Sequence, residues 1–184
     1  MKNPLPHLCQ SAVLLGLIAL SSLSQASTQG VVISQVYGGN GATFNRDYVE
    51  LFNASTQPVD ISGWSVQYSS ATGTGLFSTN GISVLNGVLQ PGQYYLVGLA
   101  TAVNGAALPT VDAPGTTNMS GTAGKVVLVN TSAGLACNGS STPCNASQQL
   151  QIVDLVGFGT ANYAETQAAT ACLCFCIIGG TKPH

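Results

Sequence analysis

The pattern of hydrophobic and polar positions in this chain is that of short strands separated by turns. In the run Tyr48–Asn53, "YVELFN", Val49 and Leu51 fall on one face and Glu50 falls on the other, between two aromatic residues. A period of two residues is typical of a strand with one buried face. We therefore expect Val49 and Leu51 to point into a core and Glu50 to point away from it.

Similar runs recur along the chain, and turn residues separate them. The chain has 22 glycines and 8 prolines, together with many serines, threonines and asparagines. Short strands with frequent turn signals predict an all-β domain, either a sandwich or a barrel. No helical periodicity follows the first 26 residues. The expected strands are Val31–Tyr37, Tyr48–Asn53, Pro58–Ser62, Trp64–Tyr68, Gly81–Leu85, Gln93–Gly98, Lys125–Asn130 and Ile152–Gly159.

The run "PVDISGW" continues the alternation after a polar turn. Val59 and Ile61 are expected to face inward, while Asp60 and Ser62 face outward. Trp64 is interpreted as core packing rather than as a platform for a stacked ligand. We expect this run and Tyr48–Asn53 to be neighbouring strands.

The first 26 residues have the pattern of a secretory signal peptide. An apolar core, Ser11–Leu20, follows a short polar start, and small residues occupy Ser24 and Ala26. This pattern predicts cleavage between Ala26 and Ser27 and export to the periplasm or the extracellular space. The apolar run is shorter than the ~20 residues of a membrane span, so no span is expected in the mature chain. A buried N-terminal helix is the alternative.

Two cysteines in the middle of the chain, Cys137 and Cys144, flank the turn sequence "NGSSTP". Export to an oxidising compartment favours a local disulfide between them. A zinc site is the alternative, but no histidine or second cysteine pair lies near them in the sequence.

The last residues differ in character from the rest. "ACLCFCIIGGTKPH" carries Cys172, Cys174 and Cys176 among apolar residues. Metal binding is conceivable, but three alternating thiols on a short end do not close a tetrahedral site alone. We divide the chain into a leader (1–26), one folded domain (27–165) and an atypical tail (166–184). The tail is interpreted as a truncated or frame-shifted end.

Charge is sparse in this chain. Only 5% of the residues are charged, the net charge is −2, and no basic run occurs. Direct binding to nucleic acid is therefore not expected, because that binding depends on Lys and Arg contacts to phosphates. Hydrophobic residues make up 45% of the chain, which is enough to build a core.

Several segments together carry a resemblance to a known family. "DYVELFNASTQPVDISGWSV" resembles the central motif of lamin tail domains, and "VVISQVYGGNG", "LQPGQYYLVG", "GKVVLVN" and "IVDLVGFG" occur around it in the matching order. The resemblance covers Val31 to Glu165. It implies an immunoglobulin-like β-sandwich.

Two further segments narrow the resemblance. "GFGTANYAET" and "ACNGSSTPC" are similar to the N-terminal lamin-tail module of large bacterial extracellular nucleases. In those proteins a separate domain of the endonuclease/exonuclease/phosphatase type performs the chemistry. No such domain is present in this sequence, so the resemblance implies an accessory role for it.

The predicted domain offers few groups for catalysis. The two histidines of the chain, His7 and His184, both fall outside this domain, which excludes triads and metal hydrolysis that depend on histidine. We predict no catalytic residue and no cofactor. The carboxylates Asp47, Glu50 and Asp60 are the candidates for a calcium site, since calcium prefers oxygen ligands.

A structural role for these carboxylates is the favoured interpretation. Asp47 and Glu50 are three residues apart, so a regular strand points them to opposite faces. Glu50 and Asp60 are expected to pair with Arg46, backbone amides or water. Asp154 is interpreted as a hydrogen-bond acceptor. The glycine-rich stretch 38–47, "GGNGATFNRD", precedes a strand and not a helix, which favours a mobile hairpin loop over a phosphate site.

The sequence thus predicts a secreted, non-catalytic accessory or interaction module from an extracellular nuclease-type protein. Its partner is expected to be a protein or a cell-surface ligand. One alternative is a free-standing surface or matrix module that binds protein or glycan. Another is an enzyme, for which we find no residues. The parent protein is, in the first interpretation, an extracellular DNA endonuclease whose catalytic domain lies elsewhere.

Overall fold

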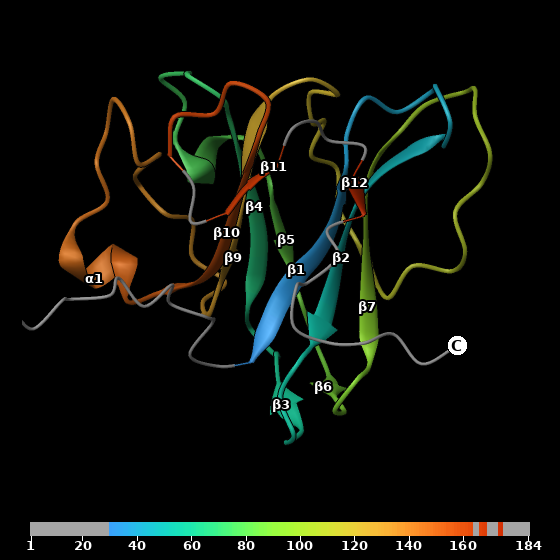
Figure 1. Cartoon of the computed structure of the whole chain (residues 1–184), viewed down its shortest axis with the longest axis horizontal. Helices are drawn as coiled ribbons and strands as arrows, with labels where there is room; N and C mark the ends of the chain where they lie inside the picture. The colour runs from blue at the N-terminus through green and yellow to red at the C-terminus, as the bar shows by residue number, and fades with distance from the viewer. Residues whose placement is uncertain (1–29, 164–165, 169–172, 175–184) are drawn as a thin grey trace, which may run out of the picture.

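Two five-stranded sheets pack face to face in the computed structural model, which describes residues 30–163, 166–168 and 173–174 (Figure 1). The β2 sheet has the strand order β12-β1-β2-β7-β8, and the β9 sheet has the order β11-β10-β9-β4-β5. A small two-stranded sheet, β3-β6, lies at one end of the sandwich. The described elements are β1 (Val31–Tyr37), β2 (Arg46–Asn53), β3 (Val59–Asp60), β4 (Ser65–Ser70), η1 (Phe77–Thr79), β5 (Ile82–Val84), β6 (Val88–Leu89), β7 (Tyr94–Thr101), β8 (Ala113–Pro114), β9 (Gly124–Val129), α1 (Ala146–Gln149), β10 (Ile152–Phe158), β11 (Thr166–Ala168) and β12 (Leu173–Cys174).

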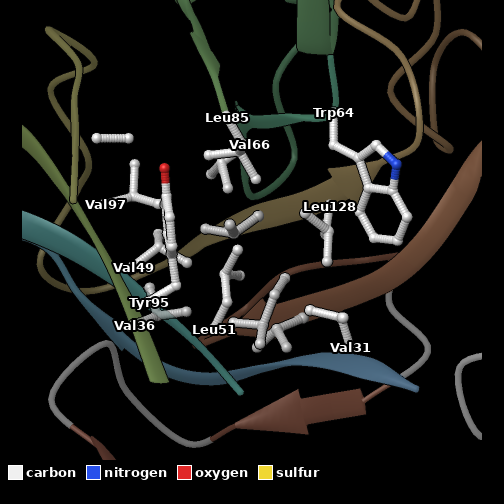
Figure 2. Close-up of a cluster of buried hydrophobic side chains, with 14 of the residues drawn as sticks. Val31, Val36, Val49, Leu51, Trp64, Val66, Leu85, Tyr95, Val97 and Leu128 are labelled. Carbon is white, nitrogen blue, oxygen red and sulfur yellow. The ribbon is translucent and has the colours of Figure 1, made fainter. Parts of the chain in front are cut away.

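The core between the sheets is built from alternate residues of the strands. In β2 buried and half-buried residues alternate along the whole strand, as the period of two predicts,. Val49 lies opposite Val36 of β1 and Val97 of β7. Figure 2 shows these side chains meeting Leu128 and others from the facing sheet. The all-β prediction is confirmed, and the arrangement is an immunoglobulin-like sandwich.

A second core lies on the other side of the β9 sheet. In β9 every residue is buried. Val126 and Leu128 point into the central core, while Val127 and Val129 join the second cluster. Strands that are covered on both faces read as continuous apolar runs rather than alternating ones. The remaining members of the second cluster are Phe77 of η1, Leu135, Cys137, Cys144 and Leu155.

The cover over the β9 sheet is held by a disulfide. Cys137 and Cys144 are bonded, with their Cα atoms 5.0 Å apart, as the sequence predicted. Phe77 N donates to Cys137 O, so η1 and the disulfide segment are tied to each other. The one-turn helix α1 follows, on the side of the β9 sheet away from the β2 sheet (Figure 1).

One prediction about strand pairing is wrong. β2 and β3 follow each other in the sequence but are not neighbours, because β2 pairs with β1 and β7 while β3 pairs with β6. The buried side chain of Asn53 explains the departure. Its Nδ2 donates to Gln57 O and Leu89 O, which turns the chain out of the β2 sheet and toward β6. The predicted inward and outward faces hold, since Ile61 and Trp64 are buried.

Some predictions fall on residues that the structure does not describe. The leader 1–26 with its cleavage site at Ala26 and Ser27, and the tail residues Cys172 and Cys176, lie outside the described residues. Two short backbone segments of the predicted tail are described. β11 runs parallel to β10, and β12 runs antiparallel to β1.

Candidate binding surface

The three carboxylates considered for calcium do not come together. Asp47 is fully buried in β2 and accepts hydrogen bonds from Asn40 N and Met119 N, both at 2.7 Å. Burial raises the pKa of Asp47, against the opposing effect of these two hydrogen bonds,. Both oxygens of this carboxylate are therefore used to hold the loop before β2 and the segment before β9.

Glu50 and Asp60 lie elsewhere. Glu50 is on the outer face of β2, where its Oε1 accepts from Ser34 Oγ at 2.7 Å. Asp60 is exposed in β3, and hydrogen bonds from the side chain and backbone of Ser62 lower its pKa. Within the described residues, no group of three His, Cys, Asp or Glu side chains is placed to hold a metal ion.

Of the partners expected for these acids, a backbone amide, Ser62 N, donates to Asp60, whereas Arg46 bonds to β7. Its guanidinium lies over Gly98 of β7, where Nε donates to Leu99 O at 2.9 Å and Nη2 donates to Gly98 O at 3.1 Å. A Cβ at position 98 would lie 2.6 Å from Val111 Cγ1 and 2.8 Å from Arg46 Nε. A larger residue there would force the side chains of Val111 and Arg46 to move, so glycine lets the guanidinium lie flat on the strand.

Asp154 acts as the predicted acceptor. Its Oδ2 accepts from Ile33 N at 2.6 Å, and its Oδ1 accepts from Leu155 N at 2.8 Å. Burial raises the pKa of this carboxyl group,. Because Ile33 belongs to β1 and Asp154 to β10, this bond joins the two sheets. Both strands carry a register shift at this point.

A buried lysine was missed in the sequence. Lys125 of β9 is fully buried, and its Nζ donates to Asn138 O at 2.9 Å and to Asn162 Oδ1 at 3.2 Å. Burial lowers the pKa of this amine,. The sequence signal that could have indicated its burial is the position of this lysine in the otherwise apolar run of β9. Because Asn138 follows Cys137 directly, the hydrogen bond from Lys125 links β9 to the disulfide segment.

The outer face of the β2 sheet carries aromatic side chains in register. Phe52 lies opposite Tyr94 across β2 and β7, and their ring centroids are 4.7 Å apart. Tyr94 is 53% exposed and Phe52 is half-buried. At the other end of the face, Tyr37 stacks on Tyr48 with centroids 5.4 Å apart, and Phe44 packs edge-on against both.

A polar row separates the two aromatic groups. Gln35 of β1 lies opposite Glu50 of β2, which lies opposite Leu96 of β7. Tyr48 Oη donates to Gln35 Oε1 at 3.1 Å. We call the half-buried and exposed side chains of these rows the aromatic face. Its members are Val32, Gln35, Tyr48, Glu50, Phe52, Tyr94 and Leu96.

The loop at one end of the aromatic face is anchored. The residues between β1 and β2 close the expected hairpin, and Tyr37 Oη accepts from Thr43 N at 3.0 Å and from Phe44 N at 3.1 Å. Asn40 Nδ2 donates to Ala100 O at 3.1 Å. Asn40 N also donates to Asp47. These bonds anchor the loop, which was predicted to be a mobile hairpin loop.

The fold and this surface define an immunoglobulin-like β-sandwich in which the central strand of one sheet is buried on both faces and the other sheet presents an aromatic face. A family model for the lamin tail domain matches residues 24–159. The chain belongs to the lamin tail domain family, as its strand motifs indicated. No curated protein sequence matches the chain. Among the described residues there is no helix with the length and apolar character needed to cross a membrane.

Proposed function

We propose that this protein is a secreted, non-catalytic interaction module that binds a cell-surface ligand through its aromatic face. In this role it positions an extracellular nuclease-type parent protein. One observation carries the proposal. The central strand β9 is covered on both faces, whereas the outer face of the β2 sheet presents Phe52 and Tyr94 in register beside Glu50. Clustered exposed aromatic residues of this kind are typical of binding surfaces.

The placement of the acids supports the non-catalytic part of the proposal. Asp47 and Asp154 each use both carboxylate oxygens to accept from backbone amides. Glu50 accepts from Ser34 at the surface of a sheet. General acid–base catalysis needs a titratable group within reach of a substrate proton, and two of these three carboxylates are turned inward to the fold.

Two other parts of the proposal, secretion and a nuclease-type parent protein, are supported by features of the sequence and by the disulfide. The leader pattern of residues 1–26 supports export, and the disulfide between Cys137 and Cys144 suits an oxidising compartment,. The similarity of "GFGTANYAET" and "ACNGSSTPC" to the N-terminal module of secreted nucleases supports the parent.

A sedimentation experiment tests the binding role. The purified protein is mixed with insoluble bacterial cell envelopes, and the fraction that sediments with them is measured. We expect Tyr94→Ala to lower the bound fraction. The matched control is Leu150→Ser, which changes a residue that is 82% exposed beyond α1 and should leave binding unchanged. Equal binding by the wild type and Tyr94→Ala would contradict the proposal.

An activity assay tests the non-catalytic role. The purified protein is incubated with plasmid DNA and Mg²⁺ or Ca²⁺, and we expect no hydrolysis. Turnover that disappears in Glu50→Gln or Asp60→Asn would overturn this part of the proposal.

A free-standing surface or matrix module is the second candidate, because the sandwich has its own hydrophobic cores and disulfide and could present the aromatic face without a linked enzyme. Reading the genomic DNA beyond codon 170 in all frames separates the two candidates. A nuclease domain encoded there supports the accessory module. A stop codon with no related sequence downstream favours the free-standing one.

A further inference from the structure

We propose that the ligand of the aromatic face is a neutral, extended oligosaccharide of the β-1,4-linked type. This inference rests on the proposed binding function and adds the chemistry of the ligand. It is carried by the size of the face, by the polar row through its middle and by the balance of charge on the outer face of β2.

The size of the face favours a small ligand over a protein. Its half-buried and exposed members lie on β1, β2 and β7 and run along β2 from Tyr48 to Phe52. Strand spacing and rise give dimensions of roughly 10 Å by 14 Å, hence an area of roughly 150 Å² between the backbone positions. Overhanging side chains increase this figure, but a stable protein interface buries about 800 Å² on each partner.

The polar row also separates the two kinds of ligand. Gln35 and Glu50 lie in the middle of the face, between the aromatic groups at its ends. A protein partner would remove Glu50 from water at the centre of its interface, where charged residues are depleted because unpaired burial is costly. Sugar hydroxyl groups are small donors that replace water on a carboxylate or an amide. Glu50 accepts from Ser34 and retains further acceptor capacity for such donors,.

The aromatic rings supply the apolar part of the recognition. Phe52 and Tyr94 form a tilted pair at one end, and the half-buried ring of Tyr48, which stacks on the buried Tyr37, lies at the other. Aromatic side chains combine a large apolar surface with few rotatable bonds, so they lose little entropy when a ligand covers them. β-1,4-linked sugars form a flat ribbon with C–H groups on its faces. Such a ribbon matches rings that lie along an antiparallel strand with hydrogen-bonding groups between them.

The charge on this outer face is balanced, which disfavours strongly ionic ligands. Arg46 is half-buried on the same face of β2 as Glu50, and its Nε and Nη2 donate to the carbonyl groups of Leu99 and Gly98 in β7. With one cation and one anion on the outer face of β2, there is no excess of positive charge to attract an acidic glycan or a phosphate,. A neutral ligand fits this distribution, and its affinity should not depend on salt.

An NMR titration tests the proposal. The full ¹⁵N-labelled protein is titrated with a glucose hexasaccharide and an N-acetylglucosamine hexasaccharide, both β-1,4-linked, to millimolar concentration. We expect at least one to shift backbone amide signals in β1, β2 and β7, with a Kd that stays constant between about 50 mM and about 500 mM salt. Shifts confined to the β9 sheet, or no shifts with either sugar, would overturn the proposal.

Variants link the shifts to the face. Tyr94→Ala should weaken binding by about tenfold, and Phe52→Leu, which keeps an apolar side chain in the sheet, by a smaller factor. Glu50→Gln should weaken it by about threefold, because it exchanges a charged acceptor for a neutral one. Leu150→Ser is the control and should bind as the wild type does. Equal affinities for Tyr94→Ala and the wild type would contradict the proposed site.

The two proposals fail in different ways. If Tyr94→Ala loses envelope binding but neither sugar gives shifts, the interaction module stands and the glycan ligand is wrong. Protease treatment of the envelopes should then abolish binding. If the sugars bind at β1, β2 and β7 but the envelopes do not retain the protein, the site is right and the envelope role is wrong.

Discussion

The central strands of the two sheets differ in how their faces are used. All six residues of β9 are buried, with Val126 in one core and Val127 in the other. In β2 only one face is buried, and the other carries Tyr48, Glu50 and Phe52 to the surface. The difference arises because η1 and the disulfide segment cover the β9 sheet, whereas the described chain leaves the aromatic face of the β2 sheet partly exposed.

This comparison separates stability from binding. The cover of the β9 sheet buries Phe77, Leu135 and the disulfide, so its side chains contribute to folding. The aromatic face contributes less, because Tyr94 remains 53% exposed after folding. Substitutions under the cover of the β9 sheet should therefore lower stability strongly. Substitutions on the aromatic face of the β2 sheet should instead weaken ligand binding.

The largest expected effect on stability comes from replacing a phenylalanine by alanine on the outer face of each sheet. Phe77→Ala should lower the free energy of unfolding by about 3–5 kcal/mol, because Phe77 is fully buried in the second core,. Phe52→Ala should cost about 1 kcal/mol, since its ring is half-buried and loses less apolar area,. Urea unfolding measures both values. Equal losses would break the comparison between the two sheets.

The disulfide gives the next largest effect. The double variant Cys137→Ser, Cys144→Ser should lower stability by about 2–3 kcal/mol, as expected for a bond that closes a short loop,. Hydrogen exchange of the wild type and of this variant shows which of the two sheets loses protection. Protection should fall in residues 135–144 and in η1, whereas β1, β2 and β7 should change only by the global loss. A selective loss in β2 would contradict the account.

Asp47 makes a smaller contribution that depends on pH. Its folded-state pKa lies above the ordinary value of 3.8, so the folded protein binds more protons than the unfolded one between these two values. The stability that this group contributes is thus fully present below pH 3.8 and is lost as pH rises through the folded pKa. Asp47→Asn should cost about 1–3 kcal/mol near pH 4, by leaving one amide unpaired, and less at neutral pH. Urea unfolding across this range measures the difference, and a constant cost would contradict the raised pKa.

Lys125 should respond to pH in the opposite direction from Asp47. Its folded-state pKa lies below 10.5, so the unfolded protein binds more protons between the folded pKa and 10.5. Stability therefore rises with pH through that window. Lys125→Met should remove this rise. At neutral pH it should cost about 1 kcal/mol, because Asn138 O loses a donor while a buried ammonium group is removed,. An alkaline rise that persists in the variant, measured by chemical denaturation, argues against the assignment.

The smallest effect on stability is expected on the aromatic face itself. Tyr94→Ala should change the free energy of unfolding by less than about 0.5 kcal/mol, as most substitutions at exposed positions do,. Thermal unfolding of Tyr94→Ala, of the wild type and of the control Leu150→Ser measures this change in stability. A loss as large as that of Phe77→Ala would mean that Tyr94 belongs to the fold and not to a binding surface.

Much of the fold followed from the sequence, because alternation in β2 and the apolar run of β9 are local signals. Their pairing partners are less local. β3 pairs with β6 because the buried side chain of Asn53 bonds Gln57 O and Leu89 O, and a strand pattern does not contain that contact. The helix α1 has a capping box between Asn145 and Gln148, but four residues are too few to show helical periodicity.

The candidate site was predictable only in part. The alternation placed Glu50 correctly between two aromatic residues on the outer face. Tyr94 joins that face because β7 pairs with β2, and two strands far apart in the sequence give no local sign of their register. The burial of Lys125 and Asp47 likewise depends on segments that cover them after folding.

The most direct test of the central claim is the envelope-bound fraction of Tyr94→Ala, measured beside Leu150→Ser in proteins whose thermal stability has been matched. If the aromatic face binds the ligand, Tyr94→Ala loses binding while Leu150→Ser retains it, with both proteins folded as the wild type is. Retained binding in Tyr94→Ala, or an equal loss in both variants, would contradict a binding role for the aromatic face of the β2 sheet.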